Sequence, residues 1–300
     1  MLGFRKKSFG LHWMPRIGII LVAILWLCRM ANAQAIDVMF VFDTTSQSWL
    51  SSTGDDPVTF AQEAVNRMNL ATINSGIDLE FRFLKALNVD YTHQSIGSDL
   101  TALQAGSGSL EDAHTQRDTW GADVVTMLVD TGSAYGTVGQ AYLLSSWSGN
   151  PNYAFSVCAI QSVDISHTLT HEVGHNLGAH HSKNQTASPG PNSYLDNQYS
   201  AGWYFTGTNE VDYHTIMAYY SDEHGNIYDA APLFSTPLET YQSTVAGHAE
   251  DGDNARLIRE TMDEVAAYYL VDLSHAGHTL KDDNGNGHAN PGESISLPIT

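Results

Sequence analysis

The chain has 300 residues, of which 33 are Asp or Glu and 13 are Lys or Arg, and its formal net charge at pH 7 is −20. A surface of that sign repels nucleic-acid phosphates and anionic lipid headgroups, so the composition argues against a protein that binds nucleic acid or adheres to membranes. The two cysteines, Cys28 and Cys158, are too few for a disulfide framework or a thiolate-rich metal site.

The first 33 residues have the pattern of a secretory signal peptide. Basic residues precede an apolar run from Ile17 to Cys28, and the small-residue sequence "ANA" follows at Ala31 to Ala33. The run has 12 residues, fewer than the roughly 20 that a membrane-spanning helix needs. We therefore expect cleavage after Ala33 and a secreted protein without stable membrane association, and an uncleaved membrane anchor is the alternative. The mature chain would keep 8 basic and 33 acidic residues, a net charge of −25.

Strand-like and helix-like patterns alternate along the rest of the chain. Short apolar or alternating runs predict strands at residues 35–43, 77–91, 123–130, 139–146 and 153–160. Amphipathic runs predict helices at residues 55–76, at 98–122 with a Gly/Ser break, from about Ser166, and at 253–273. Such alternation is typical of an α/β fold with a mixed, mostly parallel sheet. We expect one domain over residues 34–273, in which the segment Ser182–Val211 is irregular and exposed.

The sequence "HEVGHNLGAHH", from His171 to His181, places several imidazoles around one carboxylate. On a helix, His171 and His175 project from one face about 6 Å apart, so both can bind one metal ion. Glu172 then points beside the metal, where a carboxylate can act as a base on water that the metal activates. Gly178 can take the left-handed conformation that ends a helix, and the turn would return His181 to the ion as a third ligand.

Three neutral imidazoles would leave a zinc ion one open coordination position, as in catalytic zinc sites, whereas structural sites are usually closed by four protein ligands. An accidental grouping of histidines is the alternative. The pattern H-E-x-x-H-x-x-G-x-x-H fixes five positions, however, and it follows a plausible sheet, so we predict a catalytic zinc site. His180 is off the pattern and is expected to be a solvated neighbour, and His167 is expected to start the helix without a further role.

The motif resembles the zinc signature of the metzincin metallopeptidases, in which the three histidines would bind zinc and Glu172 would be the catalytic base. Metzincins also have a methionine-containing turn below the zinc, and "TIMAYY" at Thr215–Tyr220 supplies Met217. The order of the predicted elements over about residues 36–273 is most like that of the bacterial adamalysin/reprolysin-like branch. The resemblance implies a metzincin-type catalytic domain with an active-site helix and a C-terminal helix.

Three features depart from that branch. Ser182 follows the third histidine, where adamalysins typically have Asp, and the disulfides of the branch are missing. Tyr219 lies two residues after Met217, as in astacins and serralysins. The subfamily therefore stays open. We expect the phenol of Tyr219 near the zinc, either as a weak extra ligand or as a donor to the oxyanion formed during hydrolysis, and core packing of its ring is the alternative.

Residues 274–300 resemble a linker followed by the start of a truncated β-sandwich-like module. Within them, "DDNGNGHANPGE" matches a twelve-position calcium loop, with candidate ligands Asp282, Asn284, Asn286 and Glu293. The Pro-Gly pair inside the stretch opposes a following helix, so an ordinary polar turn is the alternative to a calcium site.

Together these features predict a secreted zinc endopeptidase that acts on protein or peptide substrates, with zinc as its cofactor and calcium as a second candidate ion. The alternative is a catalytically inactive, zinc-bearing extracellular binding or adhesion module. Glu172 favours the enzyme, because a binding module has no need of a base at that position. We expect substrate to pair with the predicted strand at 139–146 and the specificity pocket to come largely from residues 182–214.

Overall fold

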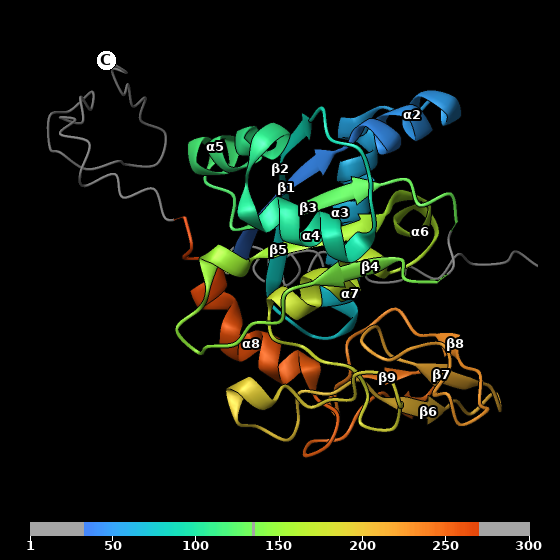
Figure 1. Cartoon of the computed structure of the whole chain (residues 1–300). Helices are drawn as coiled ribbons and strands as arrows, with labels where there is room; N and C mark the ends of the chain where they lie inside the picture. The colour runs from blue at the N-terminus through green and yellow to red at the C-terminus, as the bar shows by residue number, and fades with distance from the viewer. Residues whose placement is uncertain (1–32, 134–135, 270–300) are drawn as a thin grey trace, which may run out of the picture.

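The computed structural model describes residues 33–133 and 136–269. Its centre is a five-stranded sheet with the strand order β2-β1-β3-β5-β4 (Figure 1). The strands are β1 (Gln34–Phe42), β2 (Leu79–Asn88), β3 (Val124–Val129), β4 (Gly139–Ala141) and β5 (Phe155–Ala159). β2, β1, β3 and β5 pair in parallel, and β4 pairs antiparallel with β5. The predicted fold class, α/β with a mixed, mostly parallel sheet, is therefore confirmed.

Helices pack on both faces of this sheet (Figure 1). The cluster on one face includes residues of α2 (Thr44–Thr53), α3 (Pro57–Asn74), α6 (Ile160–Ile165), α7 (Thr168–Asn176) and α8 (Asn254–Val265). The cluster on the other face includes residues of α4 (Ile96–Ala105) and α5 (Glu111–Trp120). Successive side chains of β1 alternate between them, with Val38 and Phe40 in the first cluster and Met39 and Val41 in the second. The core thus has two apolar layers separated by the sheet.

A smaller region with short strands follows α7. One sheet has the order β6-β7-β8, and a hairpin pairs β9 with β10. These strands are β6 (Tyr204–Thr206), β7 (Asp212–His214), β8 (Asp229–Ala230), β9 (Thr240–Tyr241) and β10 (Thr244–Val245). Single 3-10 turns stand at η1 (Gly108–Leu110), η2 (Pro151–Tyr153) and η3 (Ser193–Leu195). Figure 1 shows the region in yellow and orange, on the side of α7 away from the sheet.

Side-chain caps set the N-terminal boundaries of two helices. The carboxylate of Asp56 accepts a hydrogen bond from the Thr59 N–H (2.9 Å), and Pro57 is the first residue of α3. Asp253 caps α8 in the same way, through the Arg256 N–H (3.0 Å). These contacts satisfy N–H groups that have no partner within the helix.

Two helices were not predicted, and one strand is shorter than expected. α2 buries only Ser46 and Leu50, so it has almost no apolar period. α6 continues directly from the apolar run of β5, so no change in the sequence pattern marks the first residue of this helix. The strand expected at 139–146 is regular only over Gly139–Ala141, after which the chain leaves the ladder.

The expectation that Ser182–Val211 is exposed holds only for part of the segment. Asn192, Leu195, Ser200 and Ala201 are all buried there. The segment is largely irregular, as predicted, but its polar groups are paired. The Asn192 amide, for example, donates to the carbonyl oxygens of Leu144 (2.9 Å) and Gly178 (3.0 Å). Such pairing lets a polar loop be buried without unsatisfied groups.

Several sequence-based predictions lie outside the described residues. They are the leader up to residue 32, the module proposed at 274–300, and the candidate calcium ligands Asp282, Asn284, Asn286 and Glu293. Cys158, in β5, is a buried free thiol. Over residues 33–133 and 136–269, no helix combines the length and apolar character that crossing a bilayer requires.

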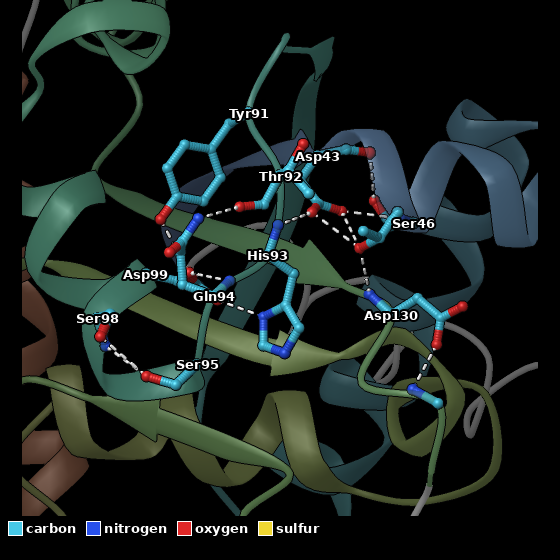
Figure 2. A network of polar contacts seen from close by, with 12 residues as sticks. Asp43, Ser46, Tyr91, Thr92, His93, Gln94, Ser95, Ser98, Asp99 and Asp130 are labelled. Carbon is cyan, nitrogen blue, oxygen red and sulfur yellow. Dashed lines mark hydrogen bonds and ion pairs between the residues drawn. The ribbon is translucent and has the colours of Figure 1, made fainter.

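Figure 2 shows a polar network at the carboxyl end of β1. The buried carboxylate of Asp43 accepts hydrogen bonds from the N–H groups of Ser46 (2.7 Å) and His93 (2.9 Å). The buried carboxylate of Asp99 accepts from the Tyr91 hydroxyl (2.8 Å) and bonds to His93 Nδ1 (2.5 Å). These bonds fix the connection between β2 and α4, and α4 in turn packs on β4 and β5 at the edge of the sheet.

Candidate metal centre

The three predicted ligands come together at the end of α7. His171 and His175 are on the helix, and Gly178 follows it with a φ of 91°, a left-handed conformation that glycine adopts without steric cost. The Ala179 N–H then donates to the Gly174 carbonyl (2.9 Å), which closes the helix end. This turn returns His181 to the other two rings. Its Nε2 lies 3.1 Å from Nε2 of His171 and 3.0 Å from Nε2 of His175.

Backbone carbonyls orient each of the three rings. Nδ1 of His171 donates to the Ile216 carbonyl (2.7 Å), Nδ1 of His175 to that of Ala179 (2.9 Å), and Nδ1 of His181 to that of Ser188 (2.9 Å). Because a carbonyl oxygen only accepts, these contacts place the proton of each neutral ring on Nδ1 and leave a lone pair on Nε2.

The lone pair on His181 Nε2 lies about 3 Å from those of His171 and His175, and such lone pairs repel one another unless a cation lies between them. The side chains therefore fit a metal ion. Within the described residues, this is the one group of three or more His, Cys, Asp or Glu side chains placed to hold a metal, and its ligand atoms all lie within 4.8 Å of one another.

The surroundings keep these imidazoles unprotonated at neutral pH. Burial lowers the pKa of His171 to about 4. Burial, with the neighbouring histidines, lowers the pKa of His181 to about 2 and that of His175 well below its usual value. Metal ions bind the neutral form of imidazole, so the site needs little deprotonation before it can bind one.

Glu172 lies in the same helix, and its side chain reaches toward the edge strand. The residue is 6% exposed, and burial raises the pKa of its carboxyl group to about 8. A Cβ on Gly139 of β4 would stand only 2.4 Å from Glu172 Oε1 and 2.7 Å from its Cγ. The carboxylate therefore packs directly on the β4 backbone, at a point where only glycine leaves room.

Met217 lies below the helix, as the resemblance implied. It is fully buried, and its Sδ would be 2.7 Å from a Cβ placed on Gly174, which lies between the two helical histidines. The Ile216 carbonyl beside it holds His171. This turn thus supports the histidine helix by close packing and by one hydrogen bond to a ring.

The ring of Tyr219 lies against the histidines. Its centroid is 4.6 Å from that of His181 and 6.0 Å from that of His171. The residue is 36% exposed, so its ring is not a core side chain. Burial, and then the charge of Glu172, raises the pKa of the phenol, which stays protonated at neutral pH. The prediction that Tyr219 stands near the three histidines agrees with this geometry, and its chemical role stays a prediction.

The two remaining histidines of this region differ in their surroundings. His167 stands at the N-terminus of α7 as expected, with its Nδ1 buried and without a hydrogen-bond partner. His180 is partly buried rather than solvated. Its Nδ1 accepts from the His181 N–H (2.8 Å), and its carbonyl accepts from the Asn254 amide (2.9 Å). His180 therefore helps to fix the backbone before the third histidine.

The open edge of the sheet runs past this site. β4 is the last strand in the sheet order, and α7 packs against it. The Leu144 N–H, just beyond β4, donates to the His175 carbonyl (2.9 Å) and so ties the edge segment to the helix. An extended chain that paired with β4 would therefore pass beside Glu172 and the three histidines.

Comparisons with known proteins agree with this geometry. A family model described as Metallo-peptidase family M12 (Reprolysin_5) matches residues 32–230. No curated protein sequence matches the chain. A solved structure titled "Structure of a chaperone-substrate complex" has a similar fold, with a TM-score of 0.56 and 17% sequence identity over 80% of this chain. This chain covers 35% of that structure's chain.

The family match spans more than half of the chain and includes the three histidines, Glu172, Met217 and Tyr219. It does not separate the bacterial branch from other members, so that assignment stays a prediction. The chain belongs to metallo-peptidase family M12, a family of metzincin-type zinc metallopeptidases.

Proposed function

We propose that this chain is a secreted zinc endopeptidase that cleaves protein or peptide substrates. The observation that supports this most is the convergence of three unprotonated Nε2 atoms beside a buried carboxylate, at the open edge of a sheet. The M12 family match supports the same function. Secretion is proposed from the leader pattern in residues 1–33.

In this proposal His171, His175 and His181 hold zinc through Nε2. A bound zinc ion supplies Lewis acidity, which makes water more acidic and polarises a carbonyl group. Glu172 accepts a proton from the water that attacks the scissile carbonyl carbon. It then delivers this proton to the amine nitrogen as the C–N bond breaks. Tyr219, as a neutral phenol, donates a hydrogen bond to the carbonyl oxygen as negative charge develops on it.

Substrate would bind in an extended conformation along β4. The inner side of Gly139–Ala141 pairs with β5, and its outer side is the sheet edge. Backbone pairing at an edge gives affinity without depending on sequence, so preference for particular side chains would come from neighbouring loops. The segment 182–214, which supplies His181, is the main candidate for such a loop.

The test is digestion of a mixed peptide library by the purified full chain, with the cut sites mapped by mass spectrometry. Cleavage should disappear with a chelator and return with zinc. Glu172→Gln should keep bound zinc but hydrolyse peptides about 10²-fold or more slowly, the usual scale of a general-base contribution. Cleavage at the wild-type rate by this variant would mean that Glu172 is not the base.

The second candidate function is a zinc-bearing binding module without turnover. It would bind zinc and capture peptides, and the library would contain no cuts in any condition. The buried Glu172 beside the histidines argues against it, because burying a titratable carboxyl group costs stability and a binding module gains nothing from doing so there.

A further inference from the structure

The backbone of Tyr219 is held from both ends by two side chains. Its N–H donates to Gln185 Oε1 (3.1 Å), and its carbonyl oxygen accepts from the Tyr204 hydroxyl (2.9 Å). Gln185 is 3% exposed, so its amide has little competing water. Tyr219 belongs to no helix or strand, and these contacts replace the ladder bonds that regular structure would supply. We call Gln185 and Tyr204 the Tyr219 clamp.

The first half of the clamp belongs to the loop that orients the third histidine. Gln185 follows His181 by four residues, and its Nε2 donates to the Ala187 carbonyl (2.9 Å). The next carbonyl in the chain, that of Ser188, accepts from His181 Nδ1 (2.9 Å). One short loop therefore fixes both the ring of His181 and the peptide N–H of Tyr219, whose ring lies 4.6 Å from that imidazole.

The second half of the clamp is itself supported by packing. The ring of Tyr204 stacks on that of Tyr228, with centroids 4.1 Å apart and an interplanar angle of 27°. The Tyr228 hydroxyl donates to Asp222 Oδ2 (3.1 Å), and its N–H donates to the Tyr220 carbonyl (2.9 Å). The two stacked tyrosines thus differ in the partner of the hydroxyl group. The Tyr204 hydroxyl contacts the backbone of Tyr219, and the Tyr228 hydroxyl contacts Asp222.

We propose that Gln185 and Tyr204 are positioning residues, which direct the Tyr219 phenol toward the carbonyl oxygen of a bound substrate. The inference rests on the proposed function, in which Tyr219 donates to that oxygen in the transition state. The residue is 36% exposed and its ring packs against imidazole, so the direction of the ring depends on the backbone that carries it. Transition-state donors are sensitive to placement, because a misdirected donor costs turnover more than substrate binding.

The stacked pair provides a matched comparison. Tyr204→Phe removes the hydroxyl that holds the Tyr219 carbonyl and keeps the stacked ring. Tyr228→Phe makes the same change on the other ring of the stack. Tyr204→Phe should lower kcat about fivefold with KM changed less than twofold, and Tyr228→Phe should change kcat less than twofold. Equal kcat values for the two variants would overturn the role of Tyr204.

Gln185→Met removes the amide at similar volume and tests the other half. It should also lower kcat about fivefold at unchanged KM. In a chain that already carries Tyr219→Phe, adding Gln185→Met or Tyr204→Phe should change kcat less than twofold, because both act through the missing hydroxyl. If each added substitution lowered kcat by the same factor with and without Tyr219→Phe, the loss would reflect general structural damage, and the proposal would be overturned.

Hydrogen exchange of the Tyr219 amide gives a readout that does not depend on turnover. Gln185→Met removes the acceptor of this N–H and should speed its exchange about tenfold or more, and Tyr228→Phe should leave the rate unchanged. An unchanged rate in Gln185→Met would overturn the clamp. Failure of the proposed function would look different, as wild-type cleavage that neither a chelator nor Glu172→Gln reduces, and the clamp would then lose its catalytic role as well.

Discussion

Replacing Gly139 by alanine should displace the proposed base without touching the histidines. The added Cβ would stand 2.4 Å from Glu172 Oε1, 2.7 Å from Cγ and 2.8 Å from Cδ, whereas ordinary contacts begin at 3.4 Å. Gly139 is in the antiparallel ladder with Cys158 of β5, so its backbone cannot easily retreat. The carboxyl group of Glu172 must therefore move by about 1 Å to reach an ordinary contact distance. A displacement of that size at a reacting group can lower the rate about 10²-fold.

We expect Gly139→Ala to lower kcat about 10- to 100-fold with zinc content unchanged. Overpacking of this kind typically costs about 1–3 kcal/mol in the free energy of unfolding. For a domain of this size, that corresponds to a fall in Tm of about 2–12 °C. The assay is hydrolysis of a fluorogenic peptide, taken from the mapped cut sites, with zinc measured by mass spectrometry on the same samples.

Gly97→Ala is the matched control. Gly97 lies in α4 beside the same sheet edge, and its added Cβ would meet only the end of the flexible Gln140 side chain, at 3.1 Å. Gly97 is the second residue of α4, where alanine fits a helix at least as well as glycine, so this variant should keep both kcat and Tm close to their wild-type values. A Gly139→Ala enzyme with bound zinc and wild-type kcat would show that turnover does not depend on the position of Glu172.

Three further outcomes are expected. His175→Ala should bind much less than one zinc per chain, because one of only three protein ligands is gone, and full occupancy by elemental analysis would refute the ligand assignment. Tyr219→Phe should lower kcat about tenfold with zinc content and Tm nearly unchanged, while Tyr220→Phe should be nearly silent, and equal small effects would return Tyr219 to a packing role. Mass spectrometry of the secreted protein should find Gln34 as the first residue, and retention of residues 1–33 would contradict the leader assignment.

The parts of the site that could be predicted from sequence are those encoded within one helix and its turn. The spacing of His171 and His175 puts both on one helix face, and Gly178 marks where the chain leaves that helix. Gly139 and Gln185 gave no such signal. Gly139 meets Glu172 only because β4 packs on α7, and the bond from Gln185 to Tyr219 joins residues 34 positions apart. Contacts of this kind depend on tertiary packing, which the local periodicity of apolar and polar residues does not indicate.

The burial of the loop after the third histidine escaped prediction for a related reason. Its composition, rich in Asn, Ser and Gly, is ordinarily that of an exposed loop. Such residues can be buried when distant backbone groups pair with them, as Leu144 and Gly178 do for Asn192. The sequence shows which hydrogen-bond donors that segment contains. It does not show whether their acceptors are water molecules or groups of the protein.

Among the residues that the structure describes, β2 and β4 are the two edge strands of the sheet, and they differ in their risk of unwanted self-association. An unpaired strand edge offers hydrogen bonds to any extended chain, including a second copy of the same protein. At one edge, the ten-residue strand β2 carries the charged residues Glu80, Arg82 and Lys85, which disfavour such pairing. At the other edge, β4 has no charged residue but is only three residues long, too short to seed a stable ladder between two folded copies. A flexible peptide can bend into so short an edge where a rigid neighbour cannot, and the same brevity would keep the chain from aggregating through it.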